Sequence, residues 1–345
     1  MNTSDFDFSL PPELIAQQPL PGRSESRMMV VDRGRRSVRH DRFRNFPGFL
    51  SRGEVLVLND TRVIPARLWG TKDGRDIEFL LVKETTAGTW RALCRPARRL
   101  RPGDTVDFAE GYRAVVTAAD EEGGRTLRFS PGSAAVLMAR AGYAPLPPYI
   151  KRGKKMADRR EEDLSRYQTV FAGPAGSIAA PTAGLHFTPE VLAAVEARGV
   201  EIAWLTLNVG LATFRPVRAR RVEDHRLLEE DTVISPEAAR AVNAARSEGR
   251  PVTAVGTTSV RALESAAAAG DGRVLDGRRA AGLFIRPGYE FRVVDRLLTN
   301  FHLPKSTLLM LVAALAGLDL VQSAYAEAVR ERYRFFSYGD CMLII

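Results

Sequence analysis

Short runs of alternating apolar and polar residues fill the chain from Ile64 to Phe129, and glycine or proline separates them, as at Gly74, Gly88 and Pro102-Gly103. Several short strands at close spacing, divided by turn residues, are typical of a small β-barrel. The pattern therefore predicts a small antiparallel β-barrel domain over residues 65–148. Its predicted strands are Ala66–Trp69, Ile77–Val82, Trp90–Cys94, Thr105–Phe108, Ala114–Ala118 and Thr126–Phe129.

A different pattern lies on either side of this stretch. Val55–Leu58 predicts a buried strand, and after Tyr167 short apolar runs alternate with segments of helical periodicity. This alternation predicts an α/β body with a mostly parallel sheet covered on both faces. We expect residues 1–64 and 149–345 to form it, with the barrel inserted. The later predicted strands are Ser177–Ala180, Val200–Val209, Val252–Val255, Leu283–Ile285 and Leu297–Phe301, and the predicted helices begin after Thr188, Ser235, Gly256, Lys305 and Asp319.

Composition adds few constraints. The chain has 345 residues, of which 45% are hydrophobic and 26% are charged, which is ordinary for a globular protein. No apolar run approaches the roughly 20 residues of a membrane span, and Met1–Leu10 lacks the basic start of a signal peptide. We expect a cytoplasmic protein with two buried free thiols, Cys94 and Cys341. Their spacing does not indicate a metal site.

The net charge of +9 comes from clustered basic residues. Basic clusters interleaved with proline and glycine can follow a phosphate backbone, so they favour a nucleic-acid partner. The alternative is that they are only solvated, arginine-rich surfaces. The candidates for RNA contact are Arg98, Arg99, Lys151, Arg152, Lys154 and Lys155.

Polar clusters follow the predicted strands. In an open α/β sheet, ligands bind where the carboxyl ends of strands meet loops. The clusters are Asn59-Asp-Thr-Arg62, Pro181–His186, Asn208, Gly256-Thr-Thr-Ser259 and Thr299–Ser306. In Gly256–Ser259, glycine permits close backbone approach and the helix that follows presents free N–H groups, which predicts either an anion site or a simple helix cap. The chain contains neither the dinucleotide-binding nor the P-loop glycine motif, which disfavours a nicotinamide or ATP enzyme.

Several side chains near these clusters could carry chemistry, and each has a structural alternative. His186 and His302 could act as general acid or base, although His186 could instead cap a backbone carbonyl. His225 follows Glu223-Asp224 and could form a carboxylate–imidazole pair. Lys305 could neutralise a carboxylate or be solvated. Three aromatic residues could stack on a nucleobase or pack in the core, namely Phe335, Phe336 and Tyr338.

Long motifs across the whole chain resemble one family, the S-adenosylmethionine:tRNA ribosyltransferase-isomerases of queuosine biosynthesis. Their length and their absence from common folds make the resemblance specific. They are Val57–Arg67, Pro147–Ile150, Tyr167–Val170, Ser177–Phe187, Gly256–Arg261, Thr299–Met310 and Tyr333–Asp340.

The resemblance implies a monomer with a β-barrel inserted in an α/β body, and it implies a specific reaction. S-adenosylmethionine donates its ribosyl group to 7-aminomethyl-7-deazaguanine at the tRNA wobble position. The ring rearranges to give epoxyqueuosine, and adenine and methionine leave. The implied partners are tRNA and S-adenosylmethionine as a substrate, with no metal, other cofactor or membrane.

The resemblance also suggests roles for single residues. The sulfonium acidifies the neighbouring C5′–H, so a base can start ring opening, and His186 or His302 is the candidate. The further catalytic candidates are Asp60 and His225. The substrate-binding candidates are Arg62, Thr182, Asn208, Gly256, Thr257, Thr258, Ser259, Arg261, Asn300, Lys305, Phe335, Tyr338 and Asp340.

The chain departs from the family pattern at two histidine positions. Leu207–Phe214 has Asn208 where the family has histidine and Ala212 where it has glycine, and Leu228 stands where a second histidine is expected. Two alternatives therefore stay open beside the tRNA enzyme. One is a paralogue that transfers the ribosyl group to a small nucleobase or metabolite, and the other is a non-catalytic RNA-binding relative.

Overall fold

A computed structural model describes residues 1–345 except 121–122, 153–156, 211–216 and 218. Among the described residues, one large sheet has the strand order β15-β13-β12-β3-β14-β16-β17-β1-β2. Its strands are β1 (Arg27–Asp32), β2 (Ser37–Arg42), β3 (Val55–Asn59), β12 (Glu201–Leu207), β13 (Glu230–Ile234), β14 (Val252–Val255), β15 (Gly277–Ala281), β16 (Arg296–Asn300) and β17 (Cys341–Ile344).

The sheet is mixed, with its parallel pairs at the centre. β3 lies between β12 and β14 and is parallel to both, β14 is parallel to β16, and β1 is parallel to β17. The remaining neighbours, including both edges, are antiparallel. Every residue of β3, β14 and β17 is buried, as expected for strands covered on both faces. The predicted fold class is confirmed, and the antiparallel strands at the edges make the sheet mixed.

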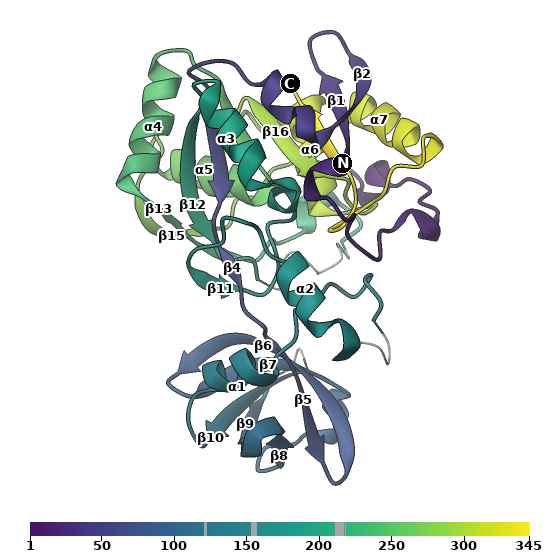
Figure 1. Ribbon diagram of the computed structural model, residues 1–345, viewed down its shortest axis with the longest axis vertical. Coiled ribbons are helices and arrows are strands. Elements are labelled where there is room, and N and C mark those ends of the chain that lie inside the picture. The colour runs from purple at the N-terminus through teal and green to yellow at the C-terminus, as the bar shows by residue number, and fades with distance from the viewer. Residues whose placement is uncertain (121–122, 153–156, 211–216, 218) are drawn as a thin grey trace.

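Helices cover both faces of this sheet (Figure 1). One face packs against η4 (Phe43–Phe49) and α3 (Pro189–Ala197), and the other against α4 (Pro236–Ser247), α5 (Thr257–Ala269), α6 (Thr307–Ala316) and α7 (Leu318–Arg330). Three of these helices begin at a hydroxyl cap: Thr188, Ser235 and Ser306 each accept a hydrogen bond from a backbone N–H three residues later. Such caps satisfy N–H groups that have no partner within the helix, which is why these helix starts were predictable from the sequence.

The barrel is closed and antiparallel, in the strand order β10-β7-β6-β5-β8-β9. Gly70 is required in β5, because a Cβ atom there would come within 2.7 Å of Val106. Helix α1 (Ala134–Ala141) packs against the barrel core through Leu137 and Met138. The strands are β5 (Arg67–Lys72), β6 (Arg75–Thr86), β7 (Thr89–Arg95), β8 (Thr105–Phe108), β9 (Arg113–Ala119) and β10 (Gly124–Ser130), which confirms the six predicted strands.

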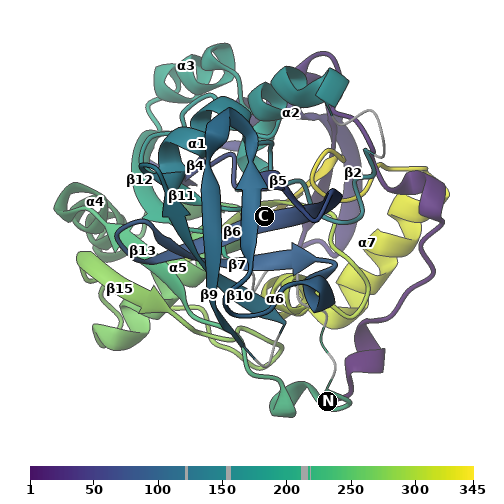
Figure 2. The same ribbon diagram turned by 90° about the horizontal axis from the view of Figure 1, so that it is seen from below.

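The barrel lies below the body in Figure 1 and in front of it in Figure 2, which is seen from below, and short elements join the two. β4 (Arg62–Val63) pairs with β11 (Ala175–Ser177), and α2 (Arg160–Arg166) lies beside them. A separate apolar cluster containing Val63, Leu146, Tyr167 and Tyr338 connects the barrel's exit segment to the body. The boundaries at residues 64/65 and 148/149 stay a prediction.

Some predicted elements differ from the observed ones. Leu283–Ile285 is not a strand, because its apolar side chains reach the core from a loop and the ladder is formed by β15. The predicted strand Ser177–Ala180 is displaced to β11. Strands β1, β2, β4, β13 and β15 were not predicted, and of these β2 and β13 are largely polar. Within the described residues, no single helix is long and apolar enough to cross a membrane; α6 and α7 meet that test only as a pair bent by 116°.

Candidate functional site

A cleft open to solvent lies where the carboxyl ends of β14 and β16 meet the loops before α5 and α6. Its wall also includes η9 (Thr182–His186) and the loop after Tyr333. The position agrees with the rule that α/β sheets bind ligands at strand ends. The polar residues of its wall are Tyr149, Tyr167, Thr182, Thr257, Thr258, Thr299, Asn300, His302, Ser306 and Ser337.

Gly256 sets the floor of the cleft at the start of α5. Its φ of 85° and ψ of 149° belong to backbone that side chains disfavour. The turn directs the first residues of α5, Thr257 and Thr258, into the cleft wall. Free N–H groups at a helix start attract anions, so the predicted anion-binding character is compatible with the position.

Thr258 and Ser259 are neighbours with different roles. The Thr258 hydroxyl is buried and has no hydrogen-bond partner among the described residues. The Ser259 hydroxyl donates to the Val255 carbonyl at 2.7 Å, is fully buried and does not line the cleft. An unpartnered buried hydroxyl is costly unless a ligand or water satisfies it. Thr258 is therefore available to a ligand, whereas Ser259 closes the first turn of the helix.

Asn300 lies at the end of β16 and is 2% exposed. Its amide nitrogen donates to His186 Nε2 and to the Phe336 carbonyl, both at 3.2 Å. Its amide oxygen is buried and has no partner among the described residues. Asn300 thus keeps one strong acceptor unused in the cleft wall.

His302 has one ring nitrogen bonded and one free of protein contacts. Nε2 lies 2.8 Å from the Thr299 hydroxyl, and the backbone N–H donates to the Tyr325 hydroxyl at 3.0 Å. Nδ1 makes no hydrogen bond with any described residue. Burial lowers the pKa of His302 to about 3, so the imidazole is neutral at pH 7. A neutral imidazole with a free nitrogen in a cleft wall can exchange a proton with a ligand.

His186 is also buried, but both of its ring nitrogens are used. Because Nε2 accepts from Asn300, Nδ1 carries the hydrogen and donates to the Ser26 hydroxyl at 2.9 Å. Burial first, and then the charges of Arg23 and Arg334, lower the pKa of His186 to about 3. It does not line the cleft. His186 therefore connects the N-terminal segment to Asn300 as a structural residue.

Tyr149 and Ser337 line the cleft but were not singled out from the sequence, whereas their neighbour Phe336 was a candidate for stacking on a nucleobase. The Tyr149 hydroxyl lies 2.8 Å from Ser337 Oγ, and the Tyr149 ring packs at 4.8 Å from that of Phe336. The three come from segments nearly 190 residues apart in the chain. A polar residue between aromatic ones, as in Phe336-Ser337-Tyr338, was the one signal available, together with the proline-rich context of Tyr149.

Three candidates after β3 and β12 lie outside the cleft wall. Asp60 accepts from the Thr206 hydroxyl at 2.6 Å, and burial raises the pKa of its carboxyl. Arg62 donates to the carbonyls of Gly173 and Ala172. Asn208 accepts from the Thr61 hydroxyl at 2.8 Å. These residues secure the loops around β4 and β11, and their contact with substrate stays a prediction.

Arg261, His225 and Lys305 also lie elsewhere. Arg261 is buried, forms an ion pair with Glu230 and donates to the Ala281 carbonyl. His225 packs edge-on against Phe284, and burial lowers its pKa; the described residues provide no carboxylate partner for it. Lys305 forms an ion pair with Asp7 at 2.7 Å on the surface. Leu228, at the second departure from the family pattern, is 43% exposed and, like Asn208, does not line the cleft.

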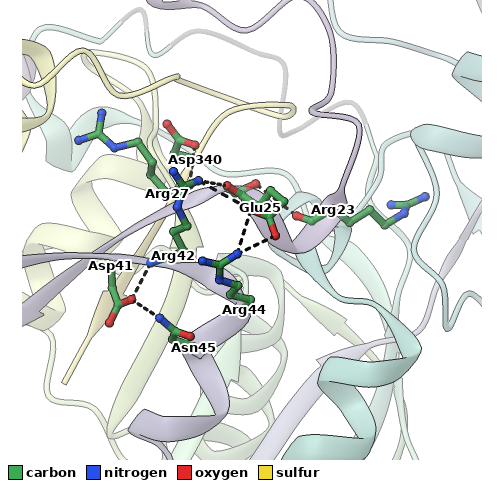
Figure 3. Close-up of polar contacts among 9 residues, drawn as sticks. Arg23, Glu25, Arg27, Asp41, Arg42, Arg44, Asn45 and Asp340 are labelled. Carbon is green, nitrogen blue, oxygen red and sulfur yellow. Dashed lines mark hydrogen bonds and ion pairs between the residues drawn. The ribbon is translucent and has the colours of Figure 1, made fainter.

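The three candidates from the C-terminal segment are buried. Phe335 is fully buried in the main core, so its position does not support stacking on a base. One oxygen of Asp340 accepts the backbone N–H of Arg27 (Figure 3) and the other accepts that of Arg334, although burial raises the pKa of this carboxyl. Tyr338 lines a second cavity beyond the cleft, which is described below.

The basic candidates differ in their availability. Arg98 and Arg99 are exposed on η5 (Ala97–Arg99) of the barrel, and Lys151 is exposed near α2. Arg152 is buried in a two-point ion pair with Asp163, with both contacts at 2.7 Å, and therefore cannot reach RNA in this state. Lys154 and Lys155 lie outside the described residues.

The cysteines are free, and no metal-binding cluster exists among the described residues. Burial raises the pKa of the Cys94 thiol to about 12, and Cys341 is fully buried in β17. No group of three or more His, Cys, Asp or Glu side chains in the described ranges could hold a metal ion.

Comparisons with known proteins agree along the whole chain. The model of the family described as "Queuosine biosynthesis protein" matches residues 3–344. Two relatives named S-adenosylmethionine:tRNA ribosyltransferase-isomerase are 49% identical (Halothermothrix orenii) and 50% identical (Symbiobacterium thermophilum), each over 100% of both chains. A crystal structure of an S-adenosylmethionine tRNA ribosyltransferase from Thermotoga maritima is 37% identical, covers 99% of this chain and 100% of its own, and has a TM-score of 0.55.

Proposed function

Because this chain belongs to the queuosine biosynthesis protein family, we propose that its cleft is the site of an S-adenosylmethionine:tRNA ribosyltransferase-isomerase. The enzyme transfers the ribosyl group of S-adenosylmethionine to tRNA and isomerises it. The acceptor is 7-aminomethyl-7-deazaguanine at the wobble position, and the products are epoxyqueuosine-tRNA, adenine and methionine. S-adenosylmethionine acts as a substrate, and the reaction uses no further cofactor. The enzyme works as a cytoplasmic monomer.

The observation that carries this proposal is a set of polar atoms left unbonded around one cleft. The Thr258 hydroxyl and the Asn300 amide oxygen are buried without partners, and His302 Nδ1 has none among the described residues. Buried polar atoms without a hydrogen-bond partner destabilise a folded protein unless a ligand or water bonds to them. The hydroxyls and amine of a ribosyl donor and its acceptor provide matching groups.

His302 is the base that we assign to the first step. In the tautomer with the hydrogen on Nε2, that nitrogen donates to the Thr299 hydroxyl and leaves the Nδ1 lone pair free. This lone pair removes the proton from the ribose C5′ carbon next to the sulfonium, and ring opening then expels adenine. The lowered pKa of His302 keeps the lone pair free at neutral pH. The anion-attracting start of α5, with Thr257 and Thr258, binds another part of the same substrate.

Exposed basic residues on the barrel and near α2 support contact with tRNA. Arg98, Arg99 and Lys151 are exposed and form no ion pair with the described residues. Such cations contribute salt-dependent affinity for a phosphate backbone and little sequence preference.

Adenine release tests this function. The purified chain is incubated with S-adenosylmethionine in three reactions, one without an acceptor, one with the free deazaguanine base and one with tRNA that carries this base. Release that requires the modified tRNA is the expected result, and the same tRNA must gain the epoxyqueuosine mass.

The other two outcomes separate the alternatives. Release with the free base alone would indicate a paralogue that acts on small molecules. Binding of tRNA without any adenine release would indicate a non-catalytic relative. Either result contradicts the proposal.

A further inference from the structure

A second, smaller cavity lies on the other side of His186 from the cleft. Ser337 lines both spaces, so the two are neighbours. The polar side chains of the second cavity are Arg23, Ser26, Arg166, His186, Ser337 and Tyr338. We call it the arginine cavity.

The arginines of this cavity are held by backbone carbonyls rather than by carboxylates. Arg23 donates to the carbonyls of Leu185 and Ser165, and Arg166 donates to that of Pro21 at 3.0 Å. Figure 3 shows the Arg23 side chain pointing away from Glu25, which instead contacts Arg42 and Arg44. The acid nearest to Arg23 in sequence therefore does not neutralise it.

Hydrogen-bond donors at this cavity are left unused. Tyr338 lines the cavity and is 4% exposed, and its buried hydroxyl has no partner among the described residues. Arg166, which also lines the cavity, has a buried Nε without a partner. Nearby, Nη1 of Arg334 is buried without a partner, and the charge of Arg334 helps to lower the pKa of His186. Burial raises the pKa of Tyr338, so its hydroxyl keeps the hydrogen that it can donate.

The carboxylates near the cavity are already bonded. Asp163, whose charge acts on Tyr338, forms the buried pair with Arg152, and Glu162 pairs with Arg159. Asp340 uses both oxygens on backbone N–H groups. Burial is the main cause that lowers the pKa of Arg23, and the nearby positive charge of Arg166 lowers it further. The cavity thus combines excess positive charge with buried unused donors, the features that bind an anionic group.

We propose that the arginine cavity is an oxyanion subsite, in which Tyr338, Arg166 and Arg23 bind a carboxylate or phosphate group of a substrate whose reacting part occupies the cleft. The inference rests on the proposed function for the identity of the substrate. Two groups of the same chemistry could enter, the methionine carboxylate of S-adenosylmethionine or a backbone phosphate of the tRNA. The cavity itself is a feature of this chain's residues and can be tested without turnover.

The first experiment uses inorganic phosphate and the variant Tyr338→Phe. The lost hydroxyl has no protein partner, so this variant should fold, whereas Arg166→Gln would release the backbone carbonyls that Arg166 holds. Unfolding temperature is followed against phosphate concentration, with ionic strength balanced by chloride. We expect phosphate to bind Tyr338→Phe about tenfold more weakly than the unsubstituted chain. The control is Tyr112→Phe, in the barrel.

The second experiment identifies which substrate provides the anion. Affinities are measured for S-adenosylmethionine, for its decarboxylated analogue and for an anticodon stem-loop. If the carboxylate enters the cavity, Tyr338→Phe weakens binding of S-adenosylmethionine but not of the analogue. If a phosphate enters, Tyr338→Phe weakens the stem-loop alone.

The proposal is overturned if phosphate stabilises the unsubstituted chain and Tyr338→Phe equally, or stabilises neither beyond chloride. It is also overturned if Tyr338→Phe leaves all three substrate affinities unchanged. Neither result depends on adenine release, so a failure here leaves the proposed reaction standing. Conversely, a chain that binds phosphate through Tyr338 but never releases adenine would contradict the proposed function and not the subsite.

Discussion

The wall of the cleft and the residues that support it contain the same kinds of side chain in opposite states. His302, Asn300 and Thr258 in the wall each keep an atom unbonded. In the support, His186 and Ser259 have their bonds completed by the protein. Burial does not separate the two groups, since His186 and His302 are 3% and 7% exposed. The difference teaches that unused hydrogen-bonding capacity, rather than residue type or depth, marks the side chains that are ready for a ligand.

The two histidines give the strongest test of this comparison. We expect His302→Gln to lower the rate of adenine release by about 10²- to 10⁴-fold, the usual contribution of a general base. His186→Asn should affect mainly stability, because both ring nitrogens bond to the protein. Single-turnover adenine release and urea unfolding are measured for both variants. The comparison breaks if His186→Asn abolishes release in a protein that remains folded while His302→Gln does not.

The Arg261–Glu230 pair is predicted to belong entirely to the support. Both side chains are buried, and Arg261→Met would leave Glu230 charged without this partner. Loss of one member of a buried pair costs about 3–5 kcal/mol, so urea unfolding should show a drop of that order. The folded fraction should keep its affinity for S-adenosylmethionine. A stable variant with weakened affinity would return Arg261 to the binding site.

Acid should weaken the fold through both buried histidines. Each has a pKa lowered to about 3 by burial, against about 6.5 in an unfolded chain. Between these values the unfolded chain binds more protons than the folded chain, so the free energy of unfolding falls as the pH falls. The expected slope is up to about 1.4 kcal/mol per pH unit for each histidine. Urea unfolding from pH 6.5 to 4.5 measures it, and His186→Asn should halve this contribution. An unchanged slope in that variant would show that His186 is not held neutral.

Thr258 and Ser259 provide the smallest and most closely matched contrast. Thr258→Val removes an unpartnered hydroxyl and should leave the free energy of unfolding unchanged or slightly raised, while KM for S-adenosylmethionine increases. Ser259→Ala removes the 2.7 Å bond to Val255 and should cost about 1 kcal/mol with KM unchanged. Steady-state kinetics and urea unfolding of the two variants are compared side by side. The opposite pattern would mean that wall and support have been assigned the wrong way round.

Local sequence patterns were sufficient for much of the fold. The six barrel strands were predictable because alternation and turn residues act within a few positions, and the helices α3, α4 and α6 because each begins at a hydroxyl cap. β13 was not predictable in this way. It alternates buried and half-buried or exposed residues but contains Glu230 and Asp231, and its buried glutamate is stabilised by groups distant in sequence, including Arg261, 31 residues away.

The site was predictable in part for a related physical reason. Polar residues at strand ends drew attention to Gly256, Thr258, Asn300 and His302, which lie in one cleft wall, and their contact with substrate stays a prediction. The sequence could not distinguish these from Arg261 or Phe335, because their roles depend on which distant groups satisfy or bury them. Tyr149 was missed for the same reason, since its partner Ser337 is 188 residues away.

Strand β17 has a consequence for how the protein is made. It is the last of the described strands to be synthesised, yet it lies inside the sheet, between β16 and β1. Its neighbour β1 is the first strand in the chain. During synthesis, β1 and β2 can pair with each other early, but β1 cannot pair with β17 until residues 341–344 have emerged from the ribosome. Phe336 and Ser337 of the cleft wall emerge only just before them. A nascent chain therefore contains all six barrel strands well before it contains Phe336 and Ser337 of the cleft wall.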